Sequence, residues 1–477
     1  MWSGRFREPL DPQFEAWQRS FPFDWRLIQN EIAASIAHAR TIAAAGILTP
    51  DEEARMIAGL QSVGNLKLDE AEFHNPASPA AASIAQAEDI HHFVELELTR
   101  NIGDLALKLH TGRSRNEQIA TDMRLFVRDA IDATLVCLRE WRSSLIDLAE
   151  SAGEAVMPSY THLQRAEPVL VAHWLLTYVS QLERDSSRLV DARKRMNLCP
   201  LGSGAIAGAT LALDRTIAAK ALGFEAPTPN SMDATSDRDF ALEFTQTLSL
   251  LGLHISRFAE ELTLFSTAEF GFLDLPEAFS TGSSAMPQKK NPDLTELIRG
   301  KSARLFGTSA TLTMLLKGLP LAYNKDLQEG QEPVFDAADT IAGILGVLPA
   351  FTSALKFNYD RMKTAATTGY LNAMAAATYL THKGVPFRKA HEKVGNAVRF
   401  GLESGRELGE LTLAELNQFG AEFGEDFYES ITLEATLDCH DVVGGTARHR
   451  VKQALAEARQ RLTANAGKGN ETSHVGL

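Results

Sequence analysis

Residues 244–265, FTQTLSLLGLHISRFAEELTLF, carry the clearest structural pattern in the chain. Large apolar residues recur there at alternating spacings of four and three, as Phe244, Leu248, Leu251, Ile255, Phe258, Leu262 and Phe265. This is the heptad seam of helices that pack side by side at shallow angles. Leu250, Leu253 and Leu264 lie off the seam, so the pattern predicts a helix that is buried on more than one face. Such burial is typical of the middle of a bundle.

Other long helices are expected around this one. One is predicted to begin at Pro168, a favourable first-turn residue, and to end before Pro200. Two more are predicted over about 117–152 and 292–317, the second again opened by a proline. Strand-like alternation is scarce and no βαβ rhythm is present, so the sequence predicts a mainly α fold.

The long helices cluster between residues 113 and 362, where turn residues are few. The sequence therefore predicts an N-terminal helical region over 1–112, a central helical bundle over 113–362 and a C-terminal helical region over 363–477. The last residues, AGKGNETSHVGL, are expected to be a frayed tail. Long helices with apolar residues on several faces also predict burial against other subunits.

Composition excludes several classes of protein. The 477 residues are 44% hydrophobic and 23% charged, which is typical of soluble globular proteins. No apolar run approaches about 18 residues, so no membrane span is predicted. The net charge of −14 argues against a nucleic-acid partner. Cys137, Cys199 and Cys439 are widely spaced, which favours neither a disulfide framework nor a zinc site and fits a reducing cytoplasm.

Five segments carry dense polar groups that a helical bundle does not need. They are EDIHHFVE (88–95), HTGRSRNEQ (110–118), SYTHLQ (159–164), GSSAMPQKKNP (282–292) and YNKDLQEGQE (323–332). A solvated helix end would explain any one of them. Because a buried polar group without a partner costs about 1–3 kcal/mol, five together indicate a functional site.

Three other chemistries are disfavoured by their sequence context. The GxGxxA pattern in LGSGAIAG (201–208) follows a basic stretch and a proline, not an apolar strand, so it is not a dinucleotide fingerprint. No HExxH motif is present, and the histidines at 91 and 92 would lie on different sides of a helix, which disfavours a metal site. No GxSxG elbow surrounds Ser283 or Ser284, which weakens a hydrolase interpretation.

The segment 282–292 has the composition of an anion cradle with a hydroxyl beside it. Pro292 can open the following helix, whose N-terminal amides favour an anion, and Lys289 and Asn291 add a charge and a hydrogen-bond donor. A reaction that needs this is removal of a proton next to a carboxylate, because the developing dianion requires fixed positive partners. The same field would lower the pKa of a loop serine. A lysine-rich solvated loop is the alternative.

These residues resemble a known signature. GSSAMPQKKNPD (282–293) resembles that of the fumarase/aspartase superfamily, and its QKKNPD part is similar to that of argininosuccinate lyases. The resemblance spans almost the whole chain through WSGRF (2–6), SFPFD (20–24), EDIH (88–91), HTGRSRNEQIATD (110–122), YTHLQRAEP (160–168), PLGSGAIAG (200–208), NSMDATSDRDF (230–240), YNKDLQE (323–329) and VGGTA (443–447).

The resemblance implies a mainly α, fumarase/aspartase-like fold in a homotetramer, whose central helices form a twenty-helix core. It also implies active sites that each collect segments from three subunits. The implied reaction is reversible β-elimination of argininosuccinate, a small anionic substrate, to arginine and fumarate in arginine biosynthesis. No metal and no organic cofactor are implied.

The resemblance also assigns roles to residues. Ser283 matches the general base, His162 the histidine associated with the general acid, and Glu296 the carboxylate paired with it. Lys289 and Asn291 match groups that hold the carboxylates. The positions that match substrate contacts are Ser20, Arg115, Asn116, Thr161, Tyr323 and Gln328. His91 falls in a motif close to the site, and its role stays open.

The sequence departs from the family pattern at several positions. Mild departures beside the catalytic positions are Ser3, Gly112, Glu117, Ser159 and Glu167. The family usually has LQEDKE where this chain has LQEGQE, so Gly330 and Gln331 replace an aspartate and a substrate-binding lysine. Two alternatives therefore stay open. One is a related lyase that eliminates fumarate from another N-substituted aspartate. The other is a catalytically silent structural relative.

Overall fold

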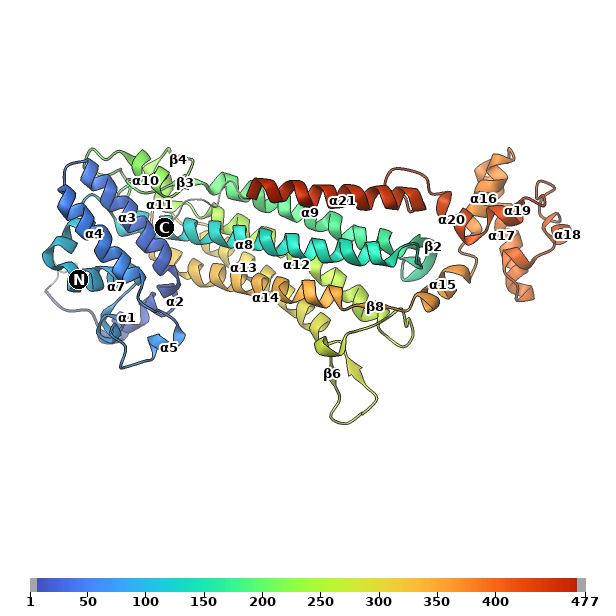
Figure 1. Ribbon diagram of the computed structural model, residues 1–477, viewed down its shortest axis with the longest axis horizontal. Coiled ribbons are helices and arrows are strands. Elements are labelled where there is room, and N and C mark those ends of the chain that lie inside the picture. Colours follow the sequence, from blue (N-terminus) through green and yellow to red (C-terminus); the bar gives the residue numbers. More distant parts are fainter. Residues whose placement is uncertain (1–6, 470–477) are drawn as a thin grey trace. The chain divides into compact units, whose positions relative to one another are not determined.

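The computed structural model describes residues 7–469 and is mainly helical (Figure 1). Contacts divide the chain into two compact units. Unit 1 comprises Met1–Leu135, Ser187–Gly252 and Ala303–Ala342, and unit 2 comprises Val136–Ser186, Leu253–Ser302 and Gly343–Leu477. The division into regions 1–112, 113–362 and 363–477 stays a prediction. The WSGRF motif, with Ser3, lies outside the described residues.

Five long helices contribute residues to both units. They are α8 (Arg115–Ala152), α9 (Val171–Met196), α12 (Asp239–Phe265), α13 (Asp293–Leu316) and α14 (Gln331–Ser353). The helices predicted over 117–152 and 292–317 are thus confirmed. The predicted start at Pro168 is wrong, because Gln164–Leu170 forms strand β2 and pairs with β1 (Val156–Thr161). Pro168 lies opposite Pro158 in this ladder, so neither proline opposes an N–H donor.

The heptad seam of α12 is confirmed by burial. Phe244, Leu248, Leu251, Ile255, Phe258 and Leu262 are 0% exposed, and Phe265 is 4% exposed. The off-seam residue Leu253 is 51% exposed. Within the single chain, the second face of α12 is therefore not buried at Leu253, although the sequence predicted its burial.

Unit 1 contains a small helical bundle formed by the N-terminal part of the chain. Helices α3 (Ile28–Ala44), α4 (Pro50–Gly64) and α7 (Ile90–Ile102) pack against one another (Figure 1). A capping box at Thr49 and Pro50 at the first helical position explain why α4 begins there. The shorter elements are α1 (Pro12–Trp17), α2 (Phe21–Asp24), η1 (Trp25–Leu27), α5 (Glu70–Phe73), α6 (Ala81–Gln86), η2 (Gly103–His110), β3 (Leu198–Cys199), α10 (Arg215–Ala221), β4 (Ala226–Pro227), α11 (Ser231–Ser236) and η4 (Lys325–Gly330).

Unit 2 has an aromatic core between the long helices. Trp141 of α8 packs on Phe258 of α12 with ring centroids 5.5 Å apart, and Tyr178 of α9 packs on the same ring at 4.9 Å. The indole N–H of Trp141 donates to Thr352 Oγ1 of α14 at 2.9 Å. These contacts bring four helices together, as the heptad pattern predicts.

The remaining elements of unit 2 are short except for its C-terminal helices. They are β5 (Leu273–Asp274), η3 (Glu277–Phe279), β6 (Thr281–Gly282), β7 (Lys290–Asn291), β8 (Lys356–Phe357), α15 (Tyr359–Thr367), α16 (Ala373–His382), α17 (Phe387–Ser404), η5 (Leu408–Glu410), α18 (Leu413–Leu416), α19 (Phe427–Ser430), α20 (Leu433–Asp438) and α21 (Arg448–Gly469). Strands β5 and β8 pair antiparallel, as do β6 and β7, whereas β3 and β4 of unit 1 pair parallel. Helix α21 includes residues 466–469 of the predicted frayed tail, and the rest of that tail lies outside the described residues.

Among the residues that the structure describes, the stretch Lys325–Ser353 is long and apolar enough to cross a membrane, with a mean hydropathy of 1.5. Val334, Ile341 and Leu348 of this stretch are at most 1% exposed. A core helix has the same composition, so this helix is weak evidence for a membrane span.

Candidate active site

The sequence-predicted site residues are distributed over both units. Ser20, His91, Arg115, Asn116, Tyr323 and Gln328 belong to unit 1. Thr161, His162, Ser283, Lys289, Asn291 and Glu296 belong to unit 2. The two sets are therefore described separately.

In unit 1, backbone and side-chain hydrogen bonds bring together segments that are far apart in the sequence. The amides of Ser20 and Phe21 both donate to the carbonyl oxygen of Glu88 at 3.0 Å. The side-chain amide of Gln328 donates to the carbonyl oxygen of Gln18 at 3.1 Å. Ser20 and Gln328, predicted as substrate contacts, thus belong to directly connected segments and are both buried.

Arg115, another predicted substrate contact, is fixed beside these segments by Asp89, the neighbour of Glu88 in the sequence. Its Nε lies 3.2 Å from Asp89 Oδ2, and Asp89 Oδ1 accepts the His92 amide at 2.7 Å. Burial acts against ionisation of Asp89, but Arg115 holds the pKa of this carboxyl below its ordinary value. Burial, together with the charge of Asp89, raises the pKa of Asp24 well above its ordinary value. Of the two carboxyls, Asp89 is therefore the more acidic.

Further cations lie in the same unit. Burial lowers the pKa of Arg238 to about 10, and Tyr323 interacts with this guanidinium. Lys325 Nζ lies 3.6 Å from Glu88 Oε1. Burial raises the pKa of Tyr323, so the phenol stays protonated and can donate a hydrogen bond. This side of unit 1 suits an anionic ligand.

Asn116 lies at the start of α8 against the turn 201–208. Its side-chain amide donates to the carbonyl oxygen of Ala205 at 3.2 Å. Gly204 has a φ of +61°, and a Cβ there would lie 2.7 Å from the carbonyl oxygen of Gly208. Only glycine fits this close approach. The GxGxxA pattern is thus a tight turn that supports Asn116, as its sequence context indicated.

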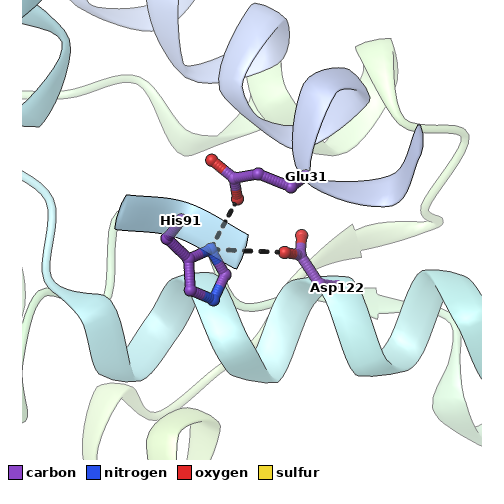
Figure 2. Close-up of side chains that lie close together, drawn as sticks. All are labelled: Glu31, His91 and Asp122. Carbon is purple, nitrogen blue, oxygen red and sulfur yellow. Dashed lines mark hydrogen bonds and ion pairs between the residues drawn. The ribbon is translucent and has the colours of Figure 1, made fainter. Parts of the chain in front are cut away.

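His91 belongs to a buried triad that the sequence did not reveal. Figure 2 shows Glu31 of α3, His91 of α7 and Asp122 of α8 pointing toward one another. His91 Nδ1 lies 2.9 Å from Glu31 Oε2 and 3.5 Å from Asp122 Oδ2. Glu31 Oε1 accepts hydrogen bonds from Ser35 Oγ at 2.6 Å and from Gln118 Nε2 at 3.2 Å. All three members of the triad are at most 3% exposed.

The two carboxyls of the triad differ in acidity. Burial and the neighbouring Glu31 raise the pKa of Asp122 well above its ordinary value. Burial acts the same way on Glu31, but His91 and Arg113 hold its pKa below its ordinary value. Glu31 therefore releases its proton at a lower pH than Asp122 does. The triad fixes the orientation of His91 and joins three helices.

The triad also has the residue types of a metal site. One ligand atom from each side chain lies within 4.8 Å of the others. The 2.9 Å separation between His91 Nδ1 and Glu31 Oε2 is an ordinary hydrogen-bond length. One signal could have revealed Glu31, because it occupies an apolar-facing position of its helix, between the buried residues Ile28 and Ile32.

In unit 2, Thr161 and His162 lie at the tip of the β1–β2 hairpin. Thr161 pairs with Gln164, so His162 and Leu163 form a two-residue turn. Their φ values are +55° and +58°, which is the left-handed region. Tyr160, next to the turn, packs on the rings of Phe265, Phe270 and Phe272 at 5.5–6.4 Å. The tip is exposed, whereas its base is packed on an aromatic cluster.

The segment 282–292 forms most of the hairpin of β6 and β7, with residues 283–289 as the loop between the two strands. This hairpin projects from the helices of unit 2 (Figure 1). Thr281 donates to Asp293 Oδ2 through its amide at 3.0 Å and its hydroxyl at 2.6 Å. These hydrogen bonds lower the pKa of Asp293. Asn291 Nδ2 lies 3.4 Å from the carbonyl oxygen of Gly282. The base of the loop is thus fastened, while Lys289 is exposed.

Ser283 accepts hydrogen bonds from its own loop. Its Oγ accepts the amides of Ala285 at 3.2 Å and Met286 at 3.0 Å. Glu296 is exposed, and its Oε1 lies 3.7 Å from Arg299 NH2. No hydrogen bond or ion pair within residues 7–469 joins Glu296 to His162. That predicted pairing is therefore not present within the described chain.

Comparison with known proteins identifies the kind of protein to which this chain is similar. Residues 4–307 match the sequence family described as Lyase, and residues 370–438 match that described as Argininosuccinate lyase C-terminal. The EDDS lyase structure in complex with formate superposes with a TM-score of 0.80 at 24% identity, covering 97% of this chain and 92% of the other. A class II fumarase from Schistosoma mansoni gives a TM-score of 0.72 at 15% identity, covering 85% and 90%. The protein is a carbon–nitrogen lyase with the helical fumarase-like fold.

Curated relatives narrow the family. Argininosuccinate lyase of Acidobacterium capsulatum is 62% identical over 466 residues, covering 97% of this chain and 94% of the relative. Argininosuccinate lyase of Koribacter versatilis is 54% identical over 464 residues, covering 97% and 98%. The chain belongs to the argininosuccinate lyase family.

Proposed function

We propose that the protein cleaves argininosuccinate to arginine and fumarate by β-elimination, and that Ser283 is the base. The observation that carries this proposal is that Ser283 Oγ accepts two backbone amides in a loop that also bears Lys289. Hydrogen bonds donated to an oxygen favour its deprotonated form. A hydroxyl in this position is therefore suited to removing a proton from carbon.

The proposed reaction has two steps, removal of a proton from carbon and cleavage of the bond between carbon and nitrogen. Ser283 takes the proton from the carbon next to a succinyl carboxylate, and the electron pair moves into that carboxylate. Lys289 and Asn291 hold the doubly charged group, whose stabilisation needs fixed positive partners. The bond between carbon and nitrogen then breaks, fumarate is formed and the nitrogen leaves with arginine.

The departing nitrogen needs a proton, and His162 with Glu296 is the proposed source. Histidine suits proton transfer near neutral pH. His162 lies at the exposed tip of the β1–β2 hairpin, where two consecutive residues have left-handed backbone. Strained backbone at a turn without glycine is typical of functional sites, which supports this role.

Substrate binding is assigned to unit 1 and to Thr161. Ser20, Arg115, Asn116, Tyr323 and Gln328 would contact the anionic substrate. The hydrogen bonds around Glu88 and the positive charges of Arg115, Arg238 and Lys325 support this assignment. No metal and no organic cofactor enter the proposed reaction, because both proton transfers use side chains of the chain.

We further infer a cytoplasmic homotetramer with active sites shared between subunits, whose central helices form a twenty-helix core. An apolar stripe along α13 supports it, with Ala303, Phe306, Ala310 and Met314 at spacings of three and four. Phe306 and Met314 are both 66% exposed in the single chain. Large apolar side chains this exposed, at spacings that place them on one face of the helix, fit burial against helices of a second copy.

The experiment supplies purified protein with argininosuccinate or with other N-substituted aspartates and follows fumarate by ultraviolet absorbance. We expect fumarate and arginine in equal amounts from argininosuccinate. Fumarate from a different aspartate adduct alone would identify a related lyase. Release of fumarate from none of them would identify a silent structural relative. Either result would overturn the proposal.

A further inference from the structure

The β1–β2 hairpin that carries Thr161 and His162 is irregular just below its tip. Pro158 pairs with Pro168 and Tyr160 pairs with Arg165, so Ser159 faces two residues of β2, Ala166 and Glu167. This is a β-bulge. The paired prolines have no N–H to give to the ladder. The hairpin is therefore weakly tied between its base and its tip.

One side chain fills this gap. Ser159 Oγ donates a hydrogen bond to the carbonyl oxygen of Glu167 at 2.7 Å and accepts one from the amide of Glu167 at 3.1 Å. A single hydroxyl thus satisfies both backbone groups of a bulged residue, replacing the ladder bonds that the bulge removes. Both Ser159 and Glu167 are positions at which the sequence departs from the family pattern.

The tip above the bulge is strained. His162 and Leu163 have φ values of +55° and +58°, and two-residue turns of this kind favour Asn and Gly. Residues with a Cβ stay in this region only when the surrounding structure fixes them. Tyr160 is held on one side by Phe265, Phe270 and Phe272. The other side of the hairpin depends on β2, which Ser159 holds.

We propose that Ser159 is a positioning residue for the catalytic turn. Its two hydrogen bonds hold β2 against β1, so that the strained turn keeps Thr161 and His162 in the geometry that the reaction needs. This inference rests on the proposed function, in which His162 supplies the proton. Ser159 itself does not touch the reacting atoms.

The test compares Ser159→Ala with Ser159→Thr, which keeps the hydroxyl. Ser404→Ala is the matched control, because the Ser404 hydroxyl also donates to a backbone carbonyl, at 2.9 Å, on the exposed surface of α17. We expect Ser159→Ala to lower kcat by about tenfold and to leave KM within about twofold, as loss of two hydrogen bonds predicts. Ser159→Thr and Ser404→Ala should keep the parent kcat.

A second readout reports on the hairpin itself. Hydrogen exchange of the Glu167 amide should be about tenfold faster in Ser159→Ala and unchanged in Ser159→Thr. Parent-like exchange in Ser159→Ala would overturn the proposal, and so would faster exchange with an unchanged kcat. Full activity of His162→Asn in the same series would overturn the proposed function itself. Because exchange is measured without substrate, the two failures are distinguishable.

Discussion

Ser283 illustrates how much a single residue can be interpreted from sequence and where structure adds to it. The sequence indicated this serine because the segment 282–292 contains lysines and prolines and resembles a known signature. The two amides that donate to its Oγ come from Ala285 and Met286, which carry no polar side chain. Backbone amides are present at almost every residue and cannot be assigned as donors from a sequence. Only the structure therefore shows that they donate to Ser283 Oγ.

Replacing Ser283 by alanine tests its role as the base. We expect Ser283→Ala to fold normally, because the loop is exposed and no core packing depends on the hydroxyl. Turnover should fall by about 10²–10⁴-fold, as loss of a catalytic base predicts. Fumarate formation and circular dichroism measure the two effects, with Ser404→Ala as the control. Near-parent turnover would remove Ser283 from the mechanism.

Gln331 stands where the family has a substrate-binding lysine, and the structure gives it a different setting. Its side chain is 3% exposed, and its Oε1 has no hydrogen-bond partner. It lines a small cavity with Arg238, Leu312 and Leu315. Gly330 is buried at the end of the helical turn η4, where a Cβ would lie 3.2 Å from Leu312 and 3.3 Å from Leu315. Glycine here permits close packing.

This setting predicts the outcome of restoring the lysine. Gln331→Lys would place a second cation beside the buried Arg238, so we expect a loss of stability of about 3–5 kcal/mol and no gain in kcat/KM. Gln331→Met is the matched neutral control and should keep the parent stability, because the glutamine oxygen is unpaired. Thermal unfolding and the fumarate assay measure both. A raised kcat/KM at unchanged stability would instead show that position 331 faces the substrate.

At the scale of elements, the regular spacing of apolar residues decided which helices could be predicted from the sequence. Apolar residues spaced four and three apart predicted α12 and its buried seam, because residues at this spacing lie on one face of a helix and pack against its neighbours. The β1–β2 hairpin was missed because Pro168 resembles a helix start, and strand pairing depends on residues 156–161 that the helix pattern does not include. The Glu31–His91–Asp122 triad was missed because its members come from three separate helices.

Helix α3 offers a prediction about pH. His38 is 1% exposed, and its Nε2 lies 3.0 Å from the carbonyl oxygen of Thr111. Burial lowers its pKa to about 3, and the nearby Arg113 and His110 act in the same direction against the opposing charge of Glu31. The folded state therefore holds His38 neutral at pH values where the unfolded state, with an ordinary pKa of about 6.5, is protonated.

The sign of the effect follows from linkage. Between about pH 6.5 and pH 3 the unfolded chain binds more protons, so His38 makes the protein less stable as the pH falls, by up to about 1.4 kcal/mol per pH unit. His38→Gln keeps a donor for Thr111 without the titration. We expect its melting temperature to fall less steeply between pH 6 and pH 4. Parallel curves for the two proteins would show that His38 does not contribute.

At the scale of the whole molecule, the predicted residues fall into two sets that lie in different compact units. The resemblance assigns each active site to segments from three subunits. A single sequence cannot show which copy supplies which segment, because spacing along one chain carries no information about contacts between chains. Among the described residues, the exposed side chains of Leu253, Phe306 and Met314 point to such contacts.

We propose that the Ser283 loop and the His162 turn act on one substrate in sites shared between copies. The test is to mix inactive Ser283→Ala with inactive His162→Asn, dissociate the proteins and let them reassemble. There are two controls. One is each single variant reassembled alone, and the other is the double variant with both Ser283→Ala and His162→Asn, reassembled with Ser283→Ala. We expect fumarate formation from argininosuccinate to return only in the mixture of the two single variants. Verified mixed oligomers with no recovered activity, or a stable active monomer, would contradict it.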